Sequence, residues 1–449
     1  MDDLLFLAHR IPFPPNKGDK LRSYHLLKHL AARYRVHLGT FVDDPADWEH
    51  VPAVAALCGG ETLCLPLAPV RAKLRSLTGL VIGQALTVPY YRDGKMAEWV
   101  DDIVARHAIR RVVVFSSPMA QYVNDLDGVS RLVDFVDVDS HKWTQYAEAS
   151  GAAAAWLYRR EARKLLEYEI HCASRAVASV FVTRPEAELF RGLIVDAADA
   201  NLQVLTIENG VDASYFSPAR AFAKPDGWQN DRGDQSGTTI VFTGAMDYRP
   251  NIDAAAWFAR DVLPIVRRSV LAAQFCIVGA RPSAEVRALA KHGEVTVTGT
   301  VDDVRPYLMH AALVVVPMRL ARGIQNKALE AMAMGAATVV SAMSAAALNA
   351  IPGRDFCVAD DAQSFARVVV ELLGDAKRRG ALGAAARFAV LENYDWTHNL
   401  ARIDRCFDSD FDRGVDRLFE CARRVESPDA SVTRSVSRDV LRATGVEHA

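Results

Sequence analysis

The sequence predicts an α/β protein built from two successive doubly wound, Rossmann-like parallel sheets. Short apolar runs rich in β-branched residues alternate with helical patterns over most of the 449 residues. One polar stretch, 224–239, interrupts this alternation with glycine, proline, asparagine and aspartate, and the alternation then restarts. With 50% apolar and 24% charged residues, the composition is that of a well-packed globular chain.

The first half carries seven candidate strands and at least three helices. Because strands and helices alternate, we expect a parallel sheet covered on both faces. The strands are expected at 4–8, 36–41, 62–65, 111–115, 132–136, 179–182 and 204–207, and the helices at 20–33, 95–107 and 156–175.

The second half repeats the pattern and then becomes helical. Strands are expected at 240–243, 275–278, 295–297, 313–316 and 338–341, and helices at 362–373, 377–391 and from 396 to about 424. The sequence therefore predicts a domain at 1–212, a linker at 213–238, a second domain at 239–393, a terminal helical segment at 394–424 and a disordered tail at 425–449.

The segment between the strands 313–316 and 338–341 is the most informative part of the chain. Pro317 ends the first of these strands, and Gly323 lies in the loop that follows. A short helix then runs to Gly335, a residue type that commonly ends helices. The segment is therefore expected to form a strand, a loop, a helix and a second strand.

The start of this helix has the residues of an anion site. Asn326 and Lys327 lie where the backbone N–H groups of a helix have no partner, so these groups and the lysine can hold a phosphate. Glu330 follows one turn later on nearly the same face and could accept hydrogen bonds from sugar hydroxyls. The alternative is an ordinary pair of exposed side chains on a helix.

A glycine turn opens the second domain, directly after the strand 240–243. Gly244 would let a ligand approach the backbone, and Arg249 could bind a diphosphate through two parallel hydrogen bonds. The alternative for Arg249 is a loop residue paired with Asp247 or Asp253.

The first domain has a proline-rich loop between its first strand and first helix. Gly18 would let the backbone approach a ligand at the helix N-terminus, whereas Asp19 is equally suited to cap the helix. The loop is not G-x-G-x-x-G, which argues against the dinucleotide site of a dehydrogenase.

A second polar strand end in this domain carries Asp134, Asp137, Asp139 and His141. We expect the three aspartates on one face of the strand and at the rim of the sheet, with Asp139 and His141 as candidate ligand-binding residues. A Ca²⁺ or Mg²⁺ site is the competing interpretation of the aspartates.

Neither cysteine nor histidine spacing indicates a metal site. The seven cysteines are scattered without a C-x-x-C pair, which fits buried thiols in a reducing cytoplasm. His25 and His29 lie four residues apart on an amphipathic helix without a third ligand, so we expect no metal and no cofactor.

From the sequence we expect neither a signal peptide nor a membrane span. Asp2 and Asp3 precede the short apolar run 4–8, and no run reaches the roughly 18 to 20 residues that cross a bilayer. The stretch 77–88 follows several basic residues, so it is either an amphipathic segment on the surface or a core helix. The net charge of −2 gives no reason to expect nucleic acid as a partner.

The loop and helix around Lys327 resemble the C-terminal signature of GT-B glycosyltransferases, in particular the retaining family 4, which reads roughly K-x-x-E-A-M-A-x-G before a valine-rich strand. The segment Asn209-Gly210-Val211-Asp212 resembles the end of the first domain in this family. Two positions depart from the pattern. Arg322 stands where many members carry a first glutamate, and Ala245 stands where they carry a first cation.

Three segments together are similar to the sugar transferases that accompany bacterial exosortase and exopolysaccharide loci. This resemblance implies a role in polysaccharide synthesis, with a glycan or lipid-linked acceptor at the inner face of the membrane and possible peripheral membrane contact. The segments are P-F-P-P-N-K-G-D-K at 12–20, M-D-Y-R-P-N at 246–251 and R-G-I-Q-N-K at 322–327.

The family resemblance also implies a place for each site residue. Two domains face a cleft, and the helical segment from residue 394 crosses back to the first domain. Arg249 and Lys327 would bind the diphosphate of a nucleoside-diphosphate sugar, Glu330 the ribose, and Asp302 would approach the base. The donor set is completed by Gly244, Gly323, Ile324, Gln325 and Asn326, and the acceptor side by Gly18, Asp139 and His141.

Three other classes of protein share this architecture. A nucleotide-sugar epimerase would isomerise the donor without transferring the sugar. A non-catalytic sugar-nucleotide-binding protein is the alternative that Arg322 and Ala245 favour. An NAD-dependent dehydrogenase would need the glycine fingerprint that this chain lacks.

Overall fold

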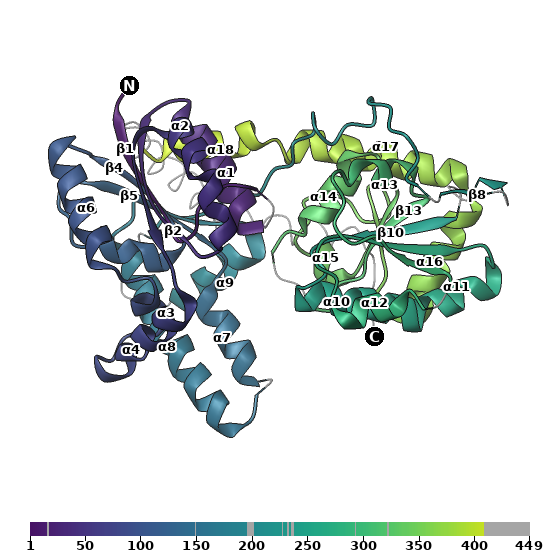
Figure 1. Cartoon of the computed structure of the whole chain (residues 1–449), viewed down its shortest axis with the longest axis horizontal. Coiled ribbons are helices and arrows are strands. Elements are labelled where there is room, and N and C mark those ends of the chain that lie inside the picture. The colour runs from purple at the N-terminus through teal and green to yellow at the C-terminus, as the bar shows by residue number, and fades with distance from the viewer. Residues whose placement is uncertain are drawn as a thin grey trace, which may run out of the picture. The chain divides into compact units, whose positions relative to one another are not determined.

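The computed structural model describes residues 1–15, 18–148, 150–194, 202–226, 228–230, 233–234, 238–291, 293–320 and 323–407. The chain divides into two compact units, Met1–Leu400 and Ala401–Ala449. Both large sheets belong to the first unit, and each is described by itself (Figure 1). The second unit is described over 401–407, which includes the end of α18 (Trp396–Arg405).

The first sheet has seven parallel strands in the order β3-β2-β1-β4-β5-β6-β7. The order reverses between β1 and β4. In a doubly wound sheet, ligands bind outside the carboxyl ends of the strands at this switch point. The strands are β1 (Asp3–Ala8), β2 (Arg35–Val42), β3 (Gly59–Pro66), β4 (Arg111–Phe115), β5 (Ser130–Val136), β6 (Ala178–Phe181) and β7 (Val204–Thr206).

Helices cover both faces of this sheet, as the burial of β1 requires. Leu5 and Leu7 pack in one cluster with residues of α6 and α8, while Leu4 and Phe6, which point the other way, are also fully buried. The helices are α1 (Gly18–Ala31), η1 (Pro45–His50), α2 (Val51–Cys58), α3 (Pro69–Ser76), α4 (Thr78–Val81), α5 (Thr87–Tyr90), α6 (Gly94–Arg106), η2 (Ser117–Tyr122), α7 (Asp139–Glu148), α8 (Ala152–Ser174) and α9 (Arg184–Ile194).

The second sheet has six parallel strands in the order β12-β11-β10-β13-β14-β15, so its switch point lies between β10 and β13. Its strands are β10 (Thr239–Thr243), β11 (Gln274–Val278), β12 (Val295–Val297), β13 (Leu313–Val316), β14 (Thr338–Val340) and β15 (Cys357–Val358). A separate antiparallel pair, β8 (Gln229–Asn230) and β9 (Gly233–Asp234), precedes it.

The helices of the second half lie on both faces of this sheet. In Figure 1, α13, α14 and α17 lie on one face, and α10, α11, α12 and α16 on the other. They are α10 (Arg249–Trp257), the π-helical turn η4 (Phe258–Val262), α11 (Leu263–Ser269), α12 (Ala284–Leu289), α13 (Arg305–His310), α14 (Asn326–Ala333), α15 (Ala342–Ala345), α16 (Ala362–Gly374) and α17 (Ala376–Asn393).

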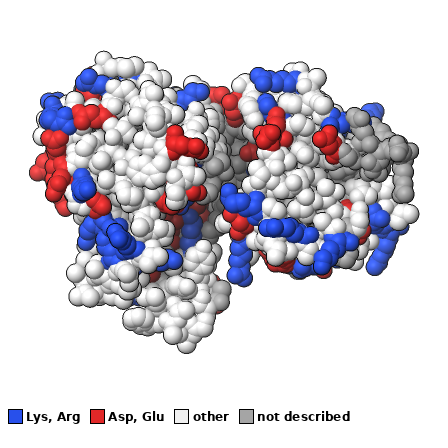
Figure 2. Space-filling view, in the orientation of Figure 1, with Lys and Arg blue, Asp and Glu red and all other residues white. Residues whose placement is uncertain are grey.

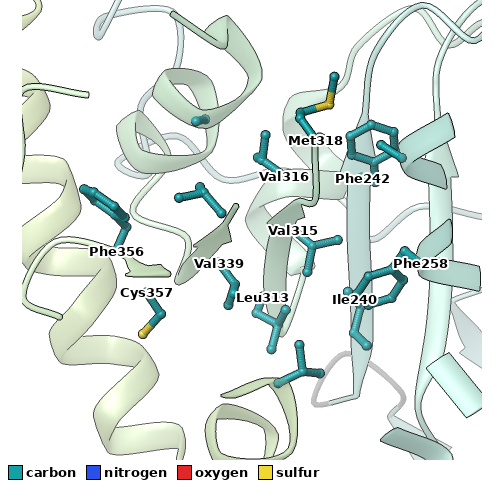
Figure 3. Packing of buried hydrophobic residues seen from close by; sticks show 14 of the residues in the cluster. Ile240, Phe242, Phe258, Leu313, Val315, Val316, Met318, Val339, Phe356 and Cys357 are labelled. Atoms are coloured by element: carbon teal, nitrogen blue, oxygen red, sulfur yellow. The ribbon is translucent and has the colours of Figure 1, made fainter. Parts of the chain in front are cut away.

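The core of the second half explains why its strands are apolar throughout. Ile240 and Phe242 of β10 lie in one hydrophobic cluster with Val315 of β13 and Val339 of β14 (Figure 3). Val241, between them in sequence, packs in a different cluster on the other side of the sheet. β10 therefore buries both its faces, as a central strand between two helix layers requires.

The predicted fold class is confirmed, and every predicted strand is present within about three residues of its predicted ends. The sequence did not predict β15, because two residues give no recognisable alternation. The pair β8 and β9 lies in the stretch expected to be a linker or exposed loop. The part of the expected last helix after residue 407 and the expected tail at 425–449 lie outside the described residues.

The stretch 77–88 is not a core helix. It forms the short helices α4 and α5, and Leu77, Leu80, Val81 and Ile82 are exposed. Burial resumes only at Ala85.

The six cysteines in the described ranges are thiols outside any disulfide, and five of them are buried. Cys421 lies outside those ranges. Within the same ranges, no helix combines the length and the apolar character needed to span a bilayer.

Candidate functional site

The loops at the switch point of the second sheet carry most of the candidate residues. Gly244 follows β10 directly, and the segment from Gly323 to Lys327 connects β13 with the first turn of α14. Because β10 and β13 are neighbours in the sheet, their carboxyl-terminal loops leave side by side. The topology thus brings together two segments that are about 80 residues apart in sequence.

The turn after β10 is held against the end of β11. Gly244 N donates to Val278 O (3.0 Å), and Met246 N donates to Ala280 O (2.8 Å). Gly279 lies so close to this turn that a Cβ atom added to it would be 1.7 Å from Gly244 O. Only glycine fits at position 279, so the close approach fixes where the β10 turn lies.

Asn251, in the first turn of α10, joins the β10 turn to Lys327. Its Nδ2 donates to Ala245 O (2.9 Å), while its Oδ1 accepts from Lys327 Nζ (3.0 Å). The Asn251 side chain is buried, so both bonds lie in a partly desolvated region. Asn251 belongs to the motif at 246–251, but no role for it was predicted from the sequence. Its position beside Pro250, at the start of a helix, was the feature of the sequence that could have indicated a role in the site.

Lys327 is a cation without a carboxylate partner among the described residues. Its Nζ donates to Asn251 Oδ1 and to Gln325 Oε1 (3.2 Å), lies 3.9 Å from Met318 Sδ, and lies 5.7 Å from the centre of the Phe242 ring. Burial lowers the pKa of Lys327 to about 8, an effect that the charge of Glu330 partly offsets. Neutral partners leave the positive charge available for an anion.

Glu330 lies one turn further along α14 and is half-buried. Burial raises the pKa of Glu330 to about 7, and the charge of Lys327 partly opposes this rise. The two side chains influence each other without forming an ion pair among the described residues. This differs from an ordinary exposed helix pair, in which the charges are solvated and the pKa values stay near normal.

The comparisons with known proteins bear on the fold and on the second half of the chain. Residues 237–375, which include β10 to α16, match the family model described as glycosyl transferases group 1. Sucrose-phosphate synthase of Thermosynechococcus elongatus has a similar structure, with a TM-score of 0.64 at 17% sequence identity, covering 94% of this chain and 100% of that one. The fold is GT-B.

Two further GT-B structures are similar over nearly their whole length. WaaG, a glycosyltransferase involved in lipopolysaccharide biosynthesis, has a TM-score of 0.60 and 16% identity over 89% of this chain and 99% of its own. HepE of Anabaena, solved in complex with UDP and glucose, has a TM-score of 0.57 and 14% identity over 90% of this chain and 98% of its own. A comparison with curated protein sequences finds no match.

Other residues that were predicted to bind the donor lie around the same loops. Arg249 is the first residue of α10 and is exposed. The carboxylates assigned to it in the alternative interpretation bind other arginines. Asp247 pairs with Arg281 (2.6 Å), and Asp253 pairs with Arg319 (2.5 Å).

The remaining predicted donor residues differ in burial. Gly323 adopts φ 62°, a conformation that favours glycine, and Asn326 is the first residue of α14. Ile324 packs into the hydrophobic core, which makes it an anchor of the loop. Asp302 is exposed after β12, whereas its neighbour Asp303 is bound by Arg305. Arg322, where the family pattern has a glutamate, lies outside the described residues.

At the first sheet, the predicted acceptor residues begin helices. Gly18 is the first residue of α1, and Asp139 is the first residue of α7, which also contains His141. Lys142 binds Asp139 (2.8 Å) and Asp137 (2.9 Å) together. This lysine neutralises much of the acidic character that suggested a metal site.

The expectation that three aspartates share one exposed strand face is wrong. β5 ends at Val136, which has φ 69°, so Asp137 and Asp139 lie beyond the strand. Asp134 is instead fully buried inside the sheet, where Arg22 of α1 donates to it (2.8 Å). Alternation along a strand applies only as far as the strand continues.

Sequence reasoning missed His9 and Arg10, which follow β1 at the switch point of the first sheet. Arg10 binds Asp43 (2.9 Å) and contacts Asp19. Burial would raise the pKa of Asp19, but its contacts with His9 and Arg10 outweigh burial and hold that pKa below its usual range. Their position directly after the first strand was the signal that could have identified them.

The described residues contain one cluster with the composition of a metal site, Asp3, His37 and His107. It lies at the amino-terminal ends of β1 and β2, away from the switch points. His37 Nδ1 accepts from Glu61 N (3.2 Å), so the proton of a neutral ring sits on Nε2, which faces Asp3 Oδ1 (2.8 Å). The ring is therefore arranged to donate to Asp3 and not to bind a metal through Nε2.

His25, the other histidine considered for a metal, stacks on Trp396 with ring centres 4.4 Å apart. Burial lowers the pKa of His25 to about 4. The ring is thus a neutral packing group, as the amphipathic pattern of its helix indicated.

Proposed function

We propose that this chain is a retaining glycosyltransferase of family 4 that moves a sugar from a nucleoside-diphosphate sugar to a hydroxyl acceptor. The observation that carries the proposal is Lys327, a cation with only neutral hydrogen-bond partners in the described structure, at the switch point of the second sheet. Helix N-termini at the switch points of such sheets bind phosphate groups, so a diphosphate is the anion that we propose.

Each residue of the switch point has a chemical task in this proposal. Lys327 and the first-turn N–H groups of α14 stabilise the negative charge that develops on the leaving diphosphate. Glu330 accepts hydrogen bonds from the ribose hydroxyls, and the exposed guanidinium of Arg249 adds a second cation. Gly244 leaves room for the phosphates, because a Cβ there would lie 2.7 Å from Asn251 Nδ2 and 3.3 Å from Lys327 Cε. We assign no catalytic base.

We further propose that residues 1–212 form the acceptor domain and 239–393 the donor domain, joined by the linker 213–238. The segment 394–424 would return to the acceptor domain, with 425–449 as a tail. The acceptor would be a glycan or lipid-linked saccharide in exopolysaccharide synthesis, handled at the cytoplasmic face of the inner membrane. The resemblance of three sequence segments supports this role, as does the involvement of WaaG in lipopolysaccharide biosynthesis.

A thermal-shift panel of nucleoside diphosphates and their sugars tests the proposal. A ligand at a hundred times its Kd adds about 2.7 kcal/mol to the free energy of unfolding, which raises the melting temperature measurably. The anomeric configuration of the product, followed by NMR, then tests retention. A donor that is isomerised without transfer would identify an epimerase, and binding without any release of nucleoside diphosphate would identify a sensor.

Donor affinity is expected to fall above pH 8. Lys327, with a pKa of about 8, is charged below that pH and neutral above it. Because a bound diphosphate favours the charged form, affinity should be nearly constant from pH 7 to 8 and then fall by up to about tenfold per pH unit. Calorimetric titrations of a nucleoside-diphosphate sugar between pH 7 and 9.5 measure this slope. An equal slope in Lys327→Ala would assign the titration to another group.

Asn251→Ala is expected to weaken donor binding by about tenfold and to lower the melting temperature. The substitution removes both the bond to Ala245 O and the acceptor of Lys327, at a cost of about 1 to 3 kcal/mol for the unsatisfied partners. Asn124→Ala is the matched control, because Asn124 is equally buried but belongs to the first half of the chain. The control should lose stability and keep its donor affinity. Equal donor affinities in the two variants would argue against a role for Asn251.

A further inference from the structure

A ridge of apolar side chains stands exposed on α3, α4 and the turn that follows them. Val81 is 88% and Val70 is 73% accessible to solvent, and the ridge extends over 13 residues. Large apolar side chains exposed together mark a surface that another phase or molecule covers. The apolar ridge consists of Val70, Leu74, Leu77, Leu80, Val81 and Ile82.

The chain around the ridge is basic and has no acidic residue. Between Glu61 and Asp93 the sequence contains no aspartate or glutamate, while Arg71 and Lys73 are exposed within the ridge itself. In Figure 2 the protruding part of the first lobe, where Figure 1 places α3 and α4, is mainly white with blue side chains at its margin. The surface thus combines apolar and positively charged groups.

The fold fixes the backbone of this segment, because arginine side chains donate hydrogen bonds to carbonyl groups next to the ridge. Arg75 donates to Pro89 O (2.8 Å) and Tyr90 O (2.6 Å), and Arg160 of α8 donates to Gly79 O (2.8 Å) and Gln84 O (3.1 Å). These bonds fix the backbone on both sides of the ridge. A segment tied down in this way presents its apolar side chains in a defined direction.

The buried Glu161 adds a further tie, since it accepts from Leu86 N (2.6 Å) and Thr87 N (2.9 Å). One turn before Arg160, Trp156 lies on the same side of α8 and is 64% exposed. Indole rings are favoured where an apolar phase meets water. Trp156 therefore adds an exposed aromatic ring on the side of α8 from which Arg160 bonds to the segment that carries the ridge.

We propose that the apolar ridge docks this chain onto a bilayer that contains anionic lipids. The aliphatic side chains would enter the boundary between headgroups and acyl chains, and Arg71 and Lys73 would contact the lipid phosphates. A second copy of the chain is a poorer occupant, because a symmetric contact would bring the same unneutralised cations together. This inference rests on the proposed function in one respect: a membrane would present the lipid-linked acceptor to the enzyme.

Vesicle flotation with the full chain tests this docking. We expect binding to vesicles of phosphatidylcholine with phosphatidylglycerol, weak binding to pure phosphatidylcholine, and a decline with salt. The double variant Leu74→Glu/Val81→Glu and the charge variant Lys73→Glu should each weaken binding at least tenfold. Leu271→Glu and Lys377→Glu, exposed positions in the second half, are the matched controls and should bind like the native chain.

Native-like vesicle binding by the ridge variants, or no binding by the native chain, would overturn the proposal. If light scattering instead shows a dimer that Leu74→Glu/Val81→Glu converts to a monomer, the ridge is a subunit interface and the lipid proposal is wrong. Because the substituted side chains are exposed, melting temperatures should not change. The nucleotide-induced thermal shift provides an independent readout: the ridge variants should retain it, and Lys327→Ala should lose it while still binding vesicles.

Discussion

Replacing Lys327 by alanine is expected to weaken the binding of nucleoside diphosphates about a hundredfold or more. The ammonium group is the one charged donor that we place on the diphosphate from within α14, and each hydrogen bond between charged groups contributes about 1.5 to 3 kcal/mol. Asn251, Gln325 and Met318 remain in the variant, but none of them carries a positive charge. Sugar transfer should fall with donor binding.

The loss of donor binding in Lys327→Ala can be distinguished from unfolding, because the pKa of Lys327 is lowered in the folded state. Burial holds the pKa of Lys327 below that of an exposed lysine, so at neutral pH the charged side chain opposes folding. Lys327→Ala without ligand should therefore melt at the same temperature as the native chain or higher. Calorimetry and thermal shift measure the two effects on one sample, with the exposed Lys377→Ala as control. An unchanged nucleotide response in Lys327→Ala would remove Lys327 from the site.

The strands could be predicted from sequence because parallel strands bury both faces. Runs such as 111–115 and 313–316 are apolar at every or nearly every position, which distinguishes them from the amphipathic helices between them. Whether the segment 77–88 is buried or exposed could not be predicted in the same way. Its apolar residues are equally suited to a core and to an exposed ridge, and only the tertiary bonds of Arg75 and Arg160 decide between them.

Residues of the candidate site could be predicted from the sequence only where the residue type itself indicates a function. A lysine at a helix start and a glycine at a strand end are recognisable in isolation, so Lys327 and Gly244 were candidates from the sequence. Asn251 and Gly279 were not, because their roles come from contacts between segments far apart in the chain. An asparagine or a glycine is common in loops, and its partner cannot be read from its neighbours.

The same limit explains the error at Asp134. Its neighbours Asp137 and Asp139 suggested a polar strand end, but the strand stops at Val136 and the buried Arg22 lies opposite Asp134. A buried ion pair of this kind joins α1 to β5 across 112 positions of sequence. Local patterns indicate that a charge must be satisfied, and the fold determines by which residue.

Gly279→Ala is expected to disrupt the site through the backbone of Gly244, against which Gly279 packs. The new Cβ would lie 1.7 Å from Gly244 O and 2.8 Å from Gly244 C, so the backbone of the β10 turn must move. Overpacking against backbone costs about 3 kcal/mol, at the upper end of the usual range. For a domain of this size, each kcal/mol lowers the melting temperature by roughly 2 to 4 °C. Calorimetry of the purified variant measures this decrease.

Donor binding should fall in the same variant, because the displaced turn carries Ala245 O, which orients Asn251 and through it Lys327. Gly299→Ala separates this effect from backbone strain. Gly299 also has a positive φ, 73°, but a Cβ there meets no atom within 4 Å. The control should lose about 1 to 2 kcal/mol of stability from the left-handed conformation and keep its donor affinity. If Gly279→Ala and Gly299→Ala bind the donor equally well, the position of the β10 turn does not control Lys327. The close packing of Gly279 against Gly244 would then serve the stability of the fold and not donor binding.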